Sequence, residues 1–137
     1  MMYLLDTNIL SELIKKQPNP HLMVRLDSTA AHALFTSCIC VMELRFGSAL
    51  RDDFEEFWSS ITREILDRVN ILALGYEEAL IAGDILASLQ KKGQRIGVED
   101  ILIASTALSH KLVVVTANTH HFTKVQGLAV ENWLEPA

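Results

Sequence analysis

The sequence is poor in the residues that mark non-globular chains. Its 137 residues include only six glycines and three prolines, and 50% of the chain is hydrophobic. This balance excludes collagen-like, low-complexity and wholly disordered proteins. The apolar runs are all far shorter than the ~18 residues of a transmembrane helix, so no membrane association is expected. We expect one domain, residues 1–137, around a sizeable core.

Two further absences concern location. The segment from Met1 to Asp6 has no basic residues and reaches an acid at once, so no signal peptide is expected. The only cysteines, Cys38 and Cys40, stand too close together on one strand to bridge each other easily. Free thiols are typical of a reducing compartment, and we therefore expect a cytoplasmic protein.

Basic charge is also scarce. The chain has 12 lysines and arginines against 17 aspartates and glutamates, a net charge of −5. A protein that simply coats nucleic acid would usually be basic. Any role on RNA or DNA therefore needs a special reason for the excess of acids.

Apolar segments of two periodicities alternate along the chain. Short apolar runs predict strands at residues 3–5, 33–39, 70–74, 112–116 and 128–133. Apolar residues at helical spacing predict helices at residues 8–15, 22–26, 41–50, 54–69, 77–92 and 99–110. This alternation predicts an α/β protein with a mostly parallel sheet covered on both faces. Such sheets bind ligands beyond the carboxyl ends of their strands.

Three acids stand at the predicted junctions. Asp6 directly follows the first strand, where it would serve equally well as a helix N-cap. Glu43 lies in the first turn of the helix after the second strand, and its apolar neighbours Met42 and Leu44 make an unpaired surface charge unfavourable there. Asp100 opens a helix directly after the glycine-bracketed loop 93–97, whereas its neighbour Glu99 is expected to face solvent.

A fourth polar residue completes this set. Asn118 follows the strand at 112–116, where its alternative role is to hold a turn. Carboxylates gathered at one sheet edge repel one another, and a hard divalent cation with oxygen ligands relieves that repulsion. We therefore predict that Asp6, Glu43 and Asp100 bind Mg²⁺ or Mn²⁺. Such an ion lowers the pKa of a bound water and binds a phosphodiester oxygen. A metal site of this kind explains why a protein that acts on nucleic acid has an excess of acidic residues.

Four segments in this order and spacing resemble a known family. They are Leu4-Leu5-Asp6-Thr7-Asn8, Glu43-Leu44-Arg45-Phe46-Gly47, Asp100-Ile101-Leu102-Ile103-Ala104, and Val115-Thr116-Ala117-Asn118 with His121-Phe122. Together they resemble the PIN-domain nucleases and, among these, the VapC-type toxins of bacterial toxin–antitoxin pairs. The resemblance runs from Tyr3 to Trp133.

The resemblance implies a three-layer α/β/α fold with a five-stranded parallel sheet and a metal-dependent endoribonuclease. Asp6, Glu43 and Asp100 match the acidic triad of that family, and Asn118 matches its fourth catalytic position. That position is often Asp, so its replacement by Asn disfavours tight binding of a second ion without RNA. Family toxins are commonly homodimers, and a small antitoxin inhibits them by reaching into the acidic site.

Other polar residues are assigned supporting roles. Thr7, Asn8 and Thr116 are expected to orient the carboxylates, although each also suits a turn or a cap. Basic side chains near the acids are expected to contact RNA phosphates. Arg45 is expected one helical turn beyond Glu43, and Lys92 and Arg95 adjoin the loop that leads into Asp100. A solvated helix end is the alternative explanation for Lys92 and its neighbour Lys91.

The aromatic residues and histidines permit other interpretations. The stripe Phe54, Phe57, Trp58, Ile61 and Ile65 is wide for a small domain, and we expect a second copy or the antitoxin to cover part of it. Phe57 and Trp58 fit this stripe better than a base-stacking platform. The pair His120-His121 suits a transition metal, but no cysteine or third histidine lies nearby to complete a zinc site.

Three other functions fit the sequence less well. A phosphorylated receiver domain needs an Asp after its central strand and a Lys after its last, and neither is present here. A haloacid-dehalogenase-like phosphatase needs an acid two residues beyond Asp6, where this chain has Asn8. The stronger alternative is a catalytically silent PIN-like module that binds RNA or an antitoxin, but such a module has no need of three mutually repelling acids.

Overall fold

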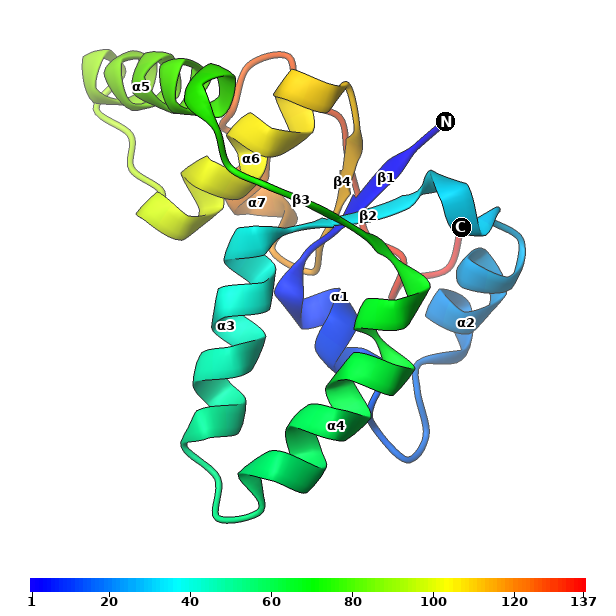
Figure 1. Cartoon of the computed structure of the whole chain (residues 1–137). Helices are drawn as coiled ribbons and strands as arrows, with labels where there is room; N and C mark the ends of the chain where they lie inside the picture. The colour runs from blue at the N-terminus through cyan, green and yellow to red at the C-terminus, as the bar shows by residue number, and fades with distance from the viewer.

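Five short strands form one parallel sheet in the computed structural model, which describes all residues 1–137 (Figure 1). They are β1 (Tyr3–Leu5), β2 (Leu34–Ser37), β3 (Asn70–Leu72), β4 (Val113–Val115) and β5 (Val130–Glu131). Their order across the sheet is β3-β2-β1-β4-β5, and every neighbouring pair is parallel. β1 therefore lies in the centre, in register with β4 from Tyr3 opposite Val113 to Leu5 opposite Val115.

The helices cover this sheet on both sides. They are α1 (Thr7–Glu12), α2 (Pro20–Asp27), α3 (Cys38–Ala49), α4 (Phe54–Glu64), α5 (Tyr76–Lys91), α6 (Val98–His110) and α7 (Thr119–Phe122). Helices α1 to α4 lie together on one side of the strands, and α5 and α6 lie on the other with α7 beside α6 (Figure 1). The predicted α/β fold of three layers is confirmed. None of the helices combines the length and the apolar run needed to cross a membrane.

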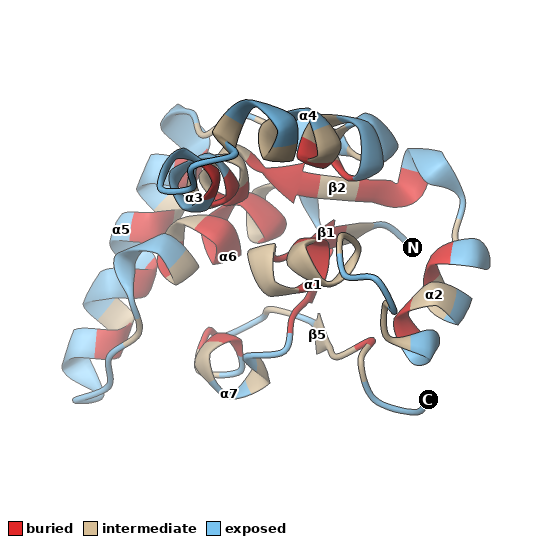
Figure 2. Cartoon of the chain, turned by 90° about the horizontal axis from the view of Figure 1, so that it is seen from below, coloured by how far each residue is buried: buried red, intermediate tan, exposed pale blue.

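The core forms where the inner helix faces meet the central strands. A single cluster of 24 buried hydrophobic residues fills both sides of the sheet. All three residues of β4 are buried because this strand is covered on both faces. Figure 2 shows the buried positions on the strands and on the inner faces of the helices, with exposed residues on the outer faces. The buried strand positions lie on β1, β2 and β4, whereas the edge strands β3 and β5 have none.

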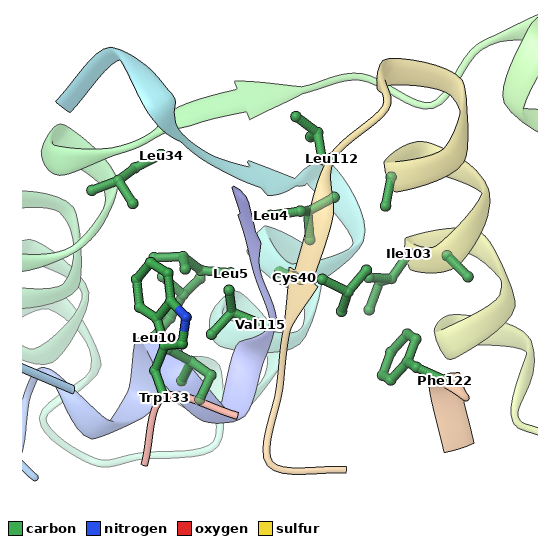
Figure 3. Packing of buried hydrophobic residues seen from close by; sticks show 14 of the residues in the cluster. Leu4, Leu5, Leu10, Leu34, Cys40, Ile103, Leu112, Val115, Phe122 and Trp133 are labelled. Carbon is green, nitrogen blue, oxygen red and sulfur yellow. The ribbon is translucent and has the colours of Figure 1, made fainter. Parts of the chain in front are cut away.

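The chain end is packed into this core. The Trp133 side chain is 1% exposed and lies with Leu5, Leu10 and Val115 (Figure 3). Its indole Nε1–H donates to Glu131 Oε1 at 2.9 Å, and Arg25 Nη2 donates to the same oxygen at 2.8 Å. The Arg25 guanidinium also lies 4.7 Å from the centre of the Trp133 ring. These contacts hold the segment after β5 against α2.

One boundary differs from the prediction in a way that affects the site. The second strand ends at Ser37, because the Ser37 hydroxyl accepts the backbone N–H of Ile39 and caps α3. Helix α3 therefore begins at Cys38, three residues before its predicted start. Cys38 and Cys40 lie in the first turn of this helix, so their expected placement on a strand was wrong. Both are free thiols, as expected.

The predicted stripe on α4 contributes mainly to the protein's own core. Ile61 and Ile65 are buried, whereas Phe54, Phe57 and Trp58 are half-buried against α3 and the turn that follows it. The more exposed apolar row lies on the neighbouring helix α3 and consists of Met42, Phe46 and Leu50, spaced four residues apart.

The packing of the chain end is testable by truncating its anchor. Trp133→Ala removes a large buried side chain together with its bond to Glu131, and should lower the free energy of unfolding by about 3–5 kcal/mol. Val24→Ala on α2 is the control, since Val24 is exposed and its truncation should cost no more than about 0.5 kcal/mol. Urea denaturation of both variants measures the difference. Equal stabilities would show that the chain end is not part of the core.

Candidate active site

The site lies where two central strands end side by side. The chain leaves β1 towards β2 and leaves β4 towards β5, so connections diverge at the carboxyl ends of this adjacent pair. Asp6 directly follows β1 and Thr116 directly follows β4. The Thr116 hydroxyl donates to Asp6 Oδ2 at 2.8 Å and joins the two strand ends.

Asp6 is held by neutral donors only. Its side chain accepts the backbone N–H of Thr7 at 2.8 Å, which makes it the N-cap of α1, and the side-chain amide of Asn8 at 3.2 Å. The Cys40 thiol lies 3.9 Å from Oδ1. The residue is 3% exposed. The N-cap interpretation of Asp6 is confirmed, and the carboxylate contacts Thr7, Asn8 and Thr116. The catalytic role of Asp6 stays a prediction.

The pKa of Asp6 is raised above its ordinary value. Burial is the largest cause, because a desolvated carboxylate favours its neutral form. The bonds from Thr116 and Thr7 lower the pKa in part, whereas the negative charges of Asp100 and Glu43 raise it further. The charges of Glu43 and Asp100 thus both act on Asp6.

Glu43 reaches this site from the second turn of α3. Because the helix begins at Cys38, the predicted placement in the first turn was wrong, and the free N–H groups at the helix start are too far away to stabilise the charge. The hydroxyl of Thr7 donates to Glu43 Oε1 at 2.7 Å instead. Asp6, Cys40 and Glu43 each offer a ligand atom, and these atoms lie within 4.8 Å of one another.

Cys40 belongs to this cluster in position but not in charge. Burial and the charge of Asp6 raise the pKa of its thiol to about 11. The thiol is therefore protonated at neutral pH. The charged ligand atoms are the carboxylate oxygens, a set that suits Mg²⁺ or Mn²⁺ better than a soft metal.

Asp100 enters from the other side of the sheet, in the first turn of α6. Its only side-chain hydrogen bond joins Oδ2 to Nδ1 of His121 on α7, at 3.0 Å. This contact of His121 was not predicted from the sequence, because the histidine follows no strand directly. The available signal was its spacing, one helical turn after Asn118. Glu99 is exposed, as expected.

Asn118 lies at the rim of the site. It is exposed, and its backbone N–H donates to the Thr116 hydroxyl at 3.0 Å, whereas its side chain makes no hydrogen bond. The Asn8 side chain accepts the neighbouring N–H of Ala117 at 3.0 Å. Asn8 and Thr116 therefore connect the turn after β4 to Asp6, and Asn118 remains available to a ligand.

The predicted basic contacts differ in position. Lys92 is the C-cap residue that follows α5, and Arg95 lies exposed in the loop that leads to α6 and Asp100. Arg45 is directed away from Glu43, because residues two apart on a helix point ~200° apart. Its guanidinium lies 4.4 Å and 4.9 Å from the ring centres of Phe54 and Trp58. The structure thus does not bring Arg45 together with the acids, and its RNA contact stays a prediction.

The donor set fits a divalent cation. None of the ion pairs includes Asp6 or Glu43, although Asp6 is buried beside two other carboxylates. A buried charge without a cationic partner is costly, and a bound cation with oxygen ligands removes that cost. The residues Asp6, Glu43 and Asp100 would hold it. The ligand atoms that lie close together are those of Asp6, Cys40 and Glu43, so Asp100 lies outside this cluster and its contact with the cation stays a prediction. His120 and His121 also lie outside it.

Comparisons with known proteins agree with this geometry. The family model described as "PIN domain" matches residues 3–128. The chain is 35% identical over 134 residues to "Ribonuclease VapC2" of Haemophilus influenzae, covering 98% of this chain and 99% of that protein. It is 32% identical over 133 residues to "tRNA(fMet)-specific endonuclease VapC" of Salmonella typhimurium, covering 97% and 98%. Among solved structures, DNA-bound VapBC from Salmonella typhimurium superposes with a TM-score of 0.88 at 32% identity, covering 97% and 98%.

The raised pKa of Asp6 predicts a pH-dependent stability difference. An acid whose pKa is higher in the folded than in the unfolded state binds protons preferentially when folded, so ionising it destabilises the fold as pH rises. Asp6→Asn removes this titration. Without divalent metal, the stability of Asp6→Asn relative to the parent should therefore increase from about pH 2.5, where residue 6 of the parent is protonated in both the folded and the unfolded state, to pH 7. Chemical denaturation in EDTA across this range measures it, and a pH-independent difference would contradict the assignment.

Proposed function

The chain belongs to the PIN domain family, and from this premise we propose that it is an endoribonuclease toxin. It cleaves RNA phosphodiester bonds with a divalent cation held by Asp6, Glu43 and Asp100, and a cognate antitoxin neutralises it. The observation that carries the proposal is the buried Asp6 carboxylate, which has two acids beside it and no cation paired with it. That arrangement suits metal-assisted hydrolysis.

The chain's own residues prepare the site. When bound, Mg²⁺ or Mn²⁺ supplies a water of lowered pKa and a positive charge for a phosphodiester oxygen. Thr7 fixes the carboxylate of Glu43, whereas Thr116 and Asn8 fix that of Asp6. Asn118 contributes a neutral amide at the rim, which adds no fourth charge to the site. These bonds hold the acids in place before the substrate arrives.

RNA as the substrate is supported by two relatives. One is named a ribonuclease and the other a tRNA(fMet)-specific endonuclease, and both align over nearly the whole chain. With a net charge of −5, the protein has no general basic surface to bind RNA. Phosphate contacts are therefore few and local, from Lys92 and Arg95 before Asp100, with Arg45 further away on α3.

The partners follow from the same resemblance. The structural neighbours include VapBC complexes, which supports a cognate antitoxin as the inhibitor, in the cytoplasm where RNA is available. A second copy of the chain is the other proposed partner. The exposed row Met42, Phe46 and Leu50 on α3 supports such an association, because contiguous exposed apolar residues mark interfaces.

The alternative is a catalytically silent module that only binds RNA or an antitoxin. The two functions differ in their need for metal. A silent module has no use for an uncompensated buried carboxylate, so its acids should bind Mn²⁺ no better than exposed acids do. Titration of Mn²⁺ into the purified protein therefore separates the two.

Replacing one metal-holding acid tests the mechanism. Asp100→Asn keeps the shape of the side chain but removes its charge, and should reduce the single-turnover rate of RNA cleavage by more than about a hundredfold, since altering even a group that orients a ligand costs ~10–100-fold. Circular dichroism should show an intact fold. The matched control is Glu99→Gln, an exposed neighbour in the same helical turn, which should keep nearly full activity. Cleavage by the Asp100→Asn protein at the parental rate would overturn the mechanism.

The basic residues before Asp100 are tested by binding at several salt concentrations. Arg95→Ala should weaken RNA binding and leave Mn²⁺ affinity nearly unchanged, because Arg95 lies outside the acidic cluster. The salt dependence should be shallow, with a slope of roughly −0.7 per neutralised phosphate on a single strand, and Arg95→Ala should reduce it by about one such contact. Fluorescence anisotropy measures both the RNA affinity and its salt slope, in a catalytically inactive variant so that the RNA stays intact. An unchanged slope in Arg95→Ala would remove this residue from the RNA contact.

A further inference from the structure

Two helices of this protein begin with the same local pattern and end up with different bonds. Helix α5 has Gly75 at its N-cap and Glu78 three residues later, and helix α6 has Gly97 at its N-cap and Asp100 three residues later. An acid at this third position commonly reaches back to the backbone N–H of the N-cap residue and completes the capping box. The local sequence therefore favours the same bond in both helices.

Only α5 makes that bond. The N–H of Gly75 donates to Glu78 Oε1 at 2.8 Å, and Glu78 is 7% exposed. In α6 the carboxylate of Asp100 accepts no bond from Gly97 and is instead joined to His121 Nδ1 at 3.0 Å. Helices α6 and α7 lie side by side, so the histidine draws the carboxylate away from the start of its own helix (Figure 1).

The direction of this bond follows from the chemistry of its two groups. An ionised carboxylate has only acceptor oxygens, so Nδ1 of His121 must carry the hydrogen. Nδ1–H is the less usual position for the proton of a neutral imidazole, and the carboxylate selects it. The His121 ring is also restrained by His120, whose ring centre lies 4.2 Å away in an edge-on arrangement.

We propose that His121 is a positioning residue for Asp100. By donating Nδ1–H to Oδ2 it keeps the carboxylate out of the capping position and leaves Oδ1 available for the divalent cation, an inference that rests on the proposed metal-dependent function. The Asp100 side chain is 22% exposed, so without this bond water and the free N–H groups of α6 compete for the same oxygens. His121 therefore raises metal affinity without touching the metal.

Three substitutions of His121 distinguish the contributions of its two ring nitrogens. The amide nitrogen of His121→Asn stands near the place of Nδ1 and restores the donor to Asp100. The amide of His121→Gln stands near the place of Nε2 and does not, and His121→Ala removes both. His120→Phe is the control, because it keeps the ring contact with His121 and removes a neighbouring imidazole.

The first measurement is Mn²⁺ binding by the full chain, read from the electron paramagnetic resonance signal of the free ion. His121→Ala and His121→Gln should bind Mn²⁺ about tenfold more weakly than the parent, whereas His121→Asn and His120→Phe should stay within about twofold. Parental affinity in His121→Ala, or an equal loss in His121→Asn, would falsify the positioning role. If the parental protein bound no Mn²⁺, the result would instead contradict the proposed function, and this inference with it.

The second measurement needs neither metal nor substrate. Long-range ¹H–¹⁵N correlation spectra of the metal-free protein, recorded at a pH where the imidazole is neutral, identify which nitrogen of His121 carries the hydrogen. The parent should show Nδ1–H, and Asp100→Ala should shift His121 to Nε2–H. An Nε2–H form in the parent would overturn the proposal even if the metal site itself is real.

Discussion

The buried carboxylate of Asp6 is the constraint around which this protein is organised. It stands between the ends of β1 and β4, caps α1, and accepts bonds from residues of both strand ends. Neutral donors lower the cost of its burial, but the charges of Glu43 and Asp100 add to that cost. The fold therefore maintains an unbalanced negative charge at its centre, and the core around β1 and β4 supplies the stability that this requires.

The surrounding elements have structural and chemical roles at once. Thr7 begins α1 and also bonds to Glu43 on α3, and Thr116 ends β4 and also bonds to Asp6. Helix α6 carries Asp100 at its start, whereas α5, which begins with the same glycine-and-acid spacing, uses its acid Glu78 to bond to its own N-cap residue. The Asp100 carboxylate thus serves the site instead of completing the start of its own helix. Such a loss of local stability at a functional site is a common compromise.

The sequence was most informative where residues adjoin apolar runs. Asp6 and Thr116 follow strands directly, and Asp100 follows a glycine loop, so parallel strand ends predicted that they would meet. Predictions based on distance along a helix were less successful. Arg45 is close to Glu43 in sequence but points towards Phe54 and Trp58, because residues two positions apart on a helix point in nearly opposite directions.

By itself the sequence determined the parallel α/β fold and its buried central strands, and it singled out Asp6, Glu43 and Asp100, because apolar periodicity and junction residues are local signals that the chain carries directly. Only the tertiary structure decided that Cys40 lies protonated beside Asp6 and that His121 bonds to Asp100. Each of these depends on contacts between elements far apart in the chain. Burial and bonding partners at such contacts follow from packing across the sheet, which no local pattern encodes.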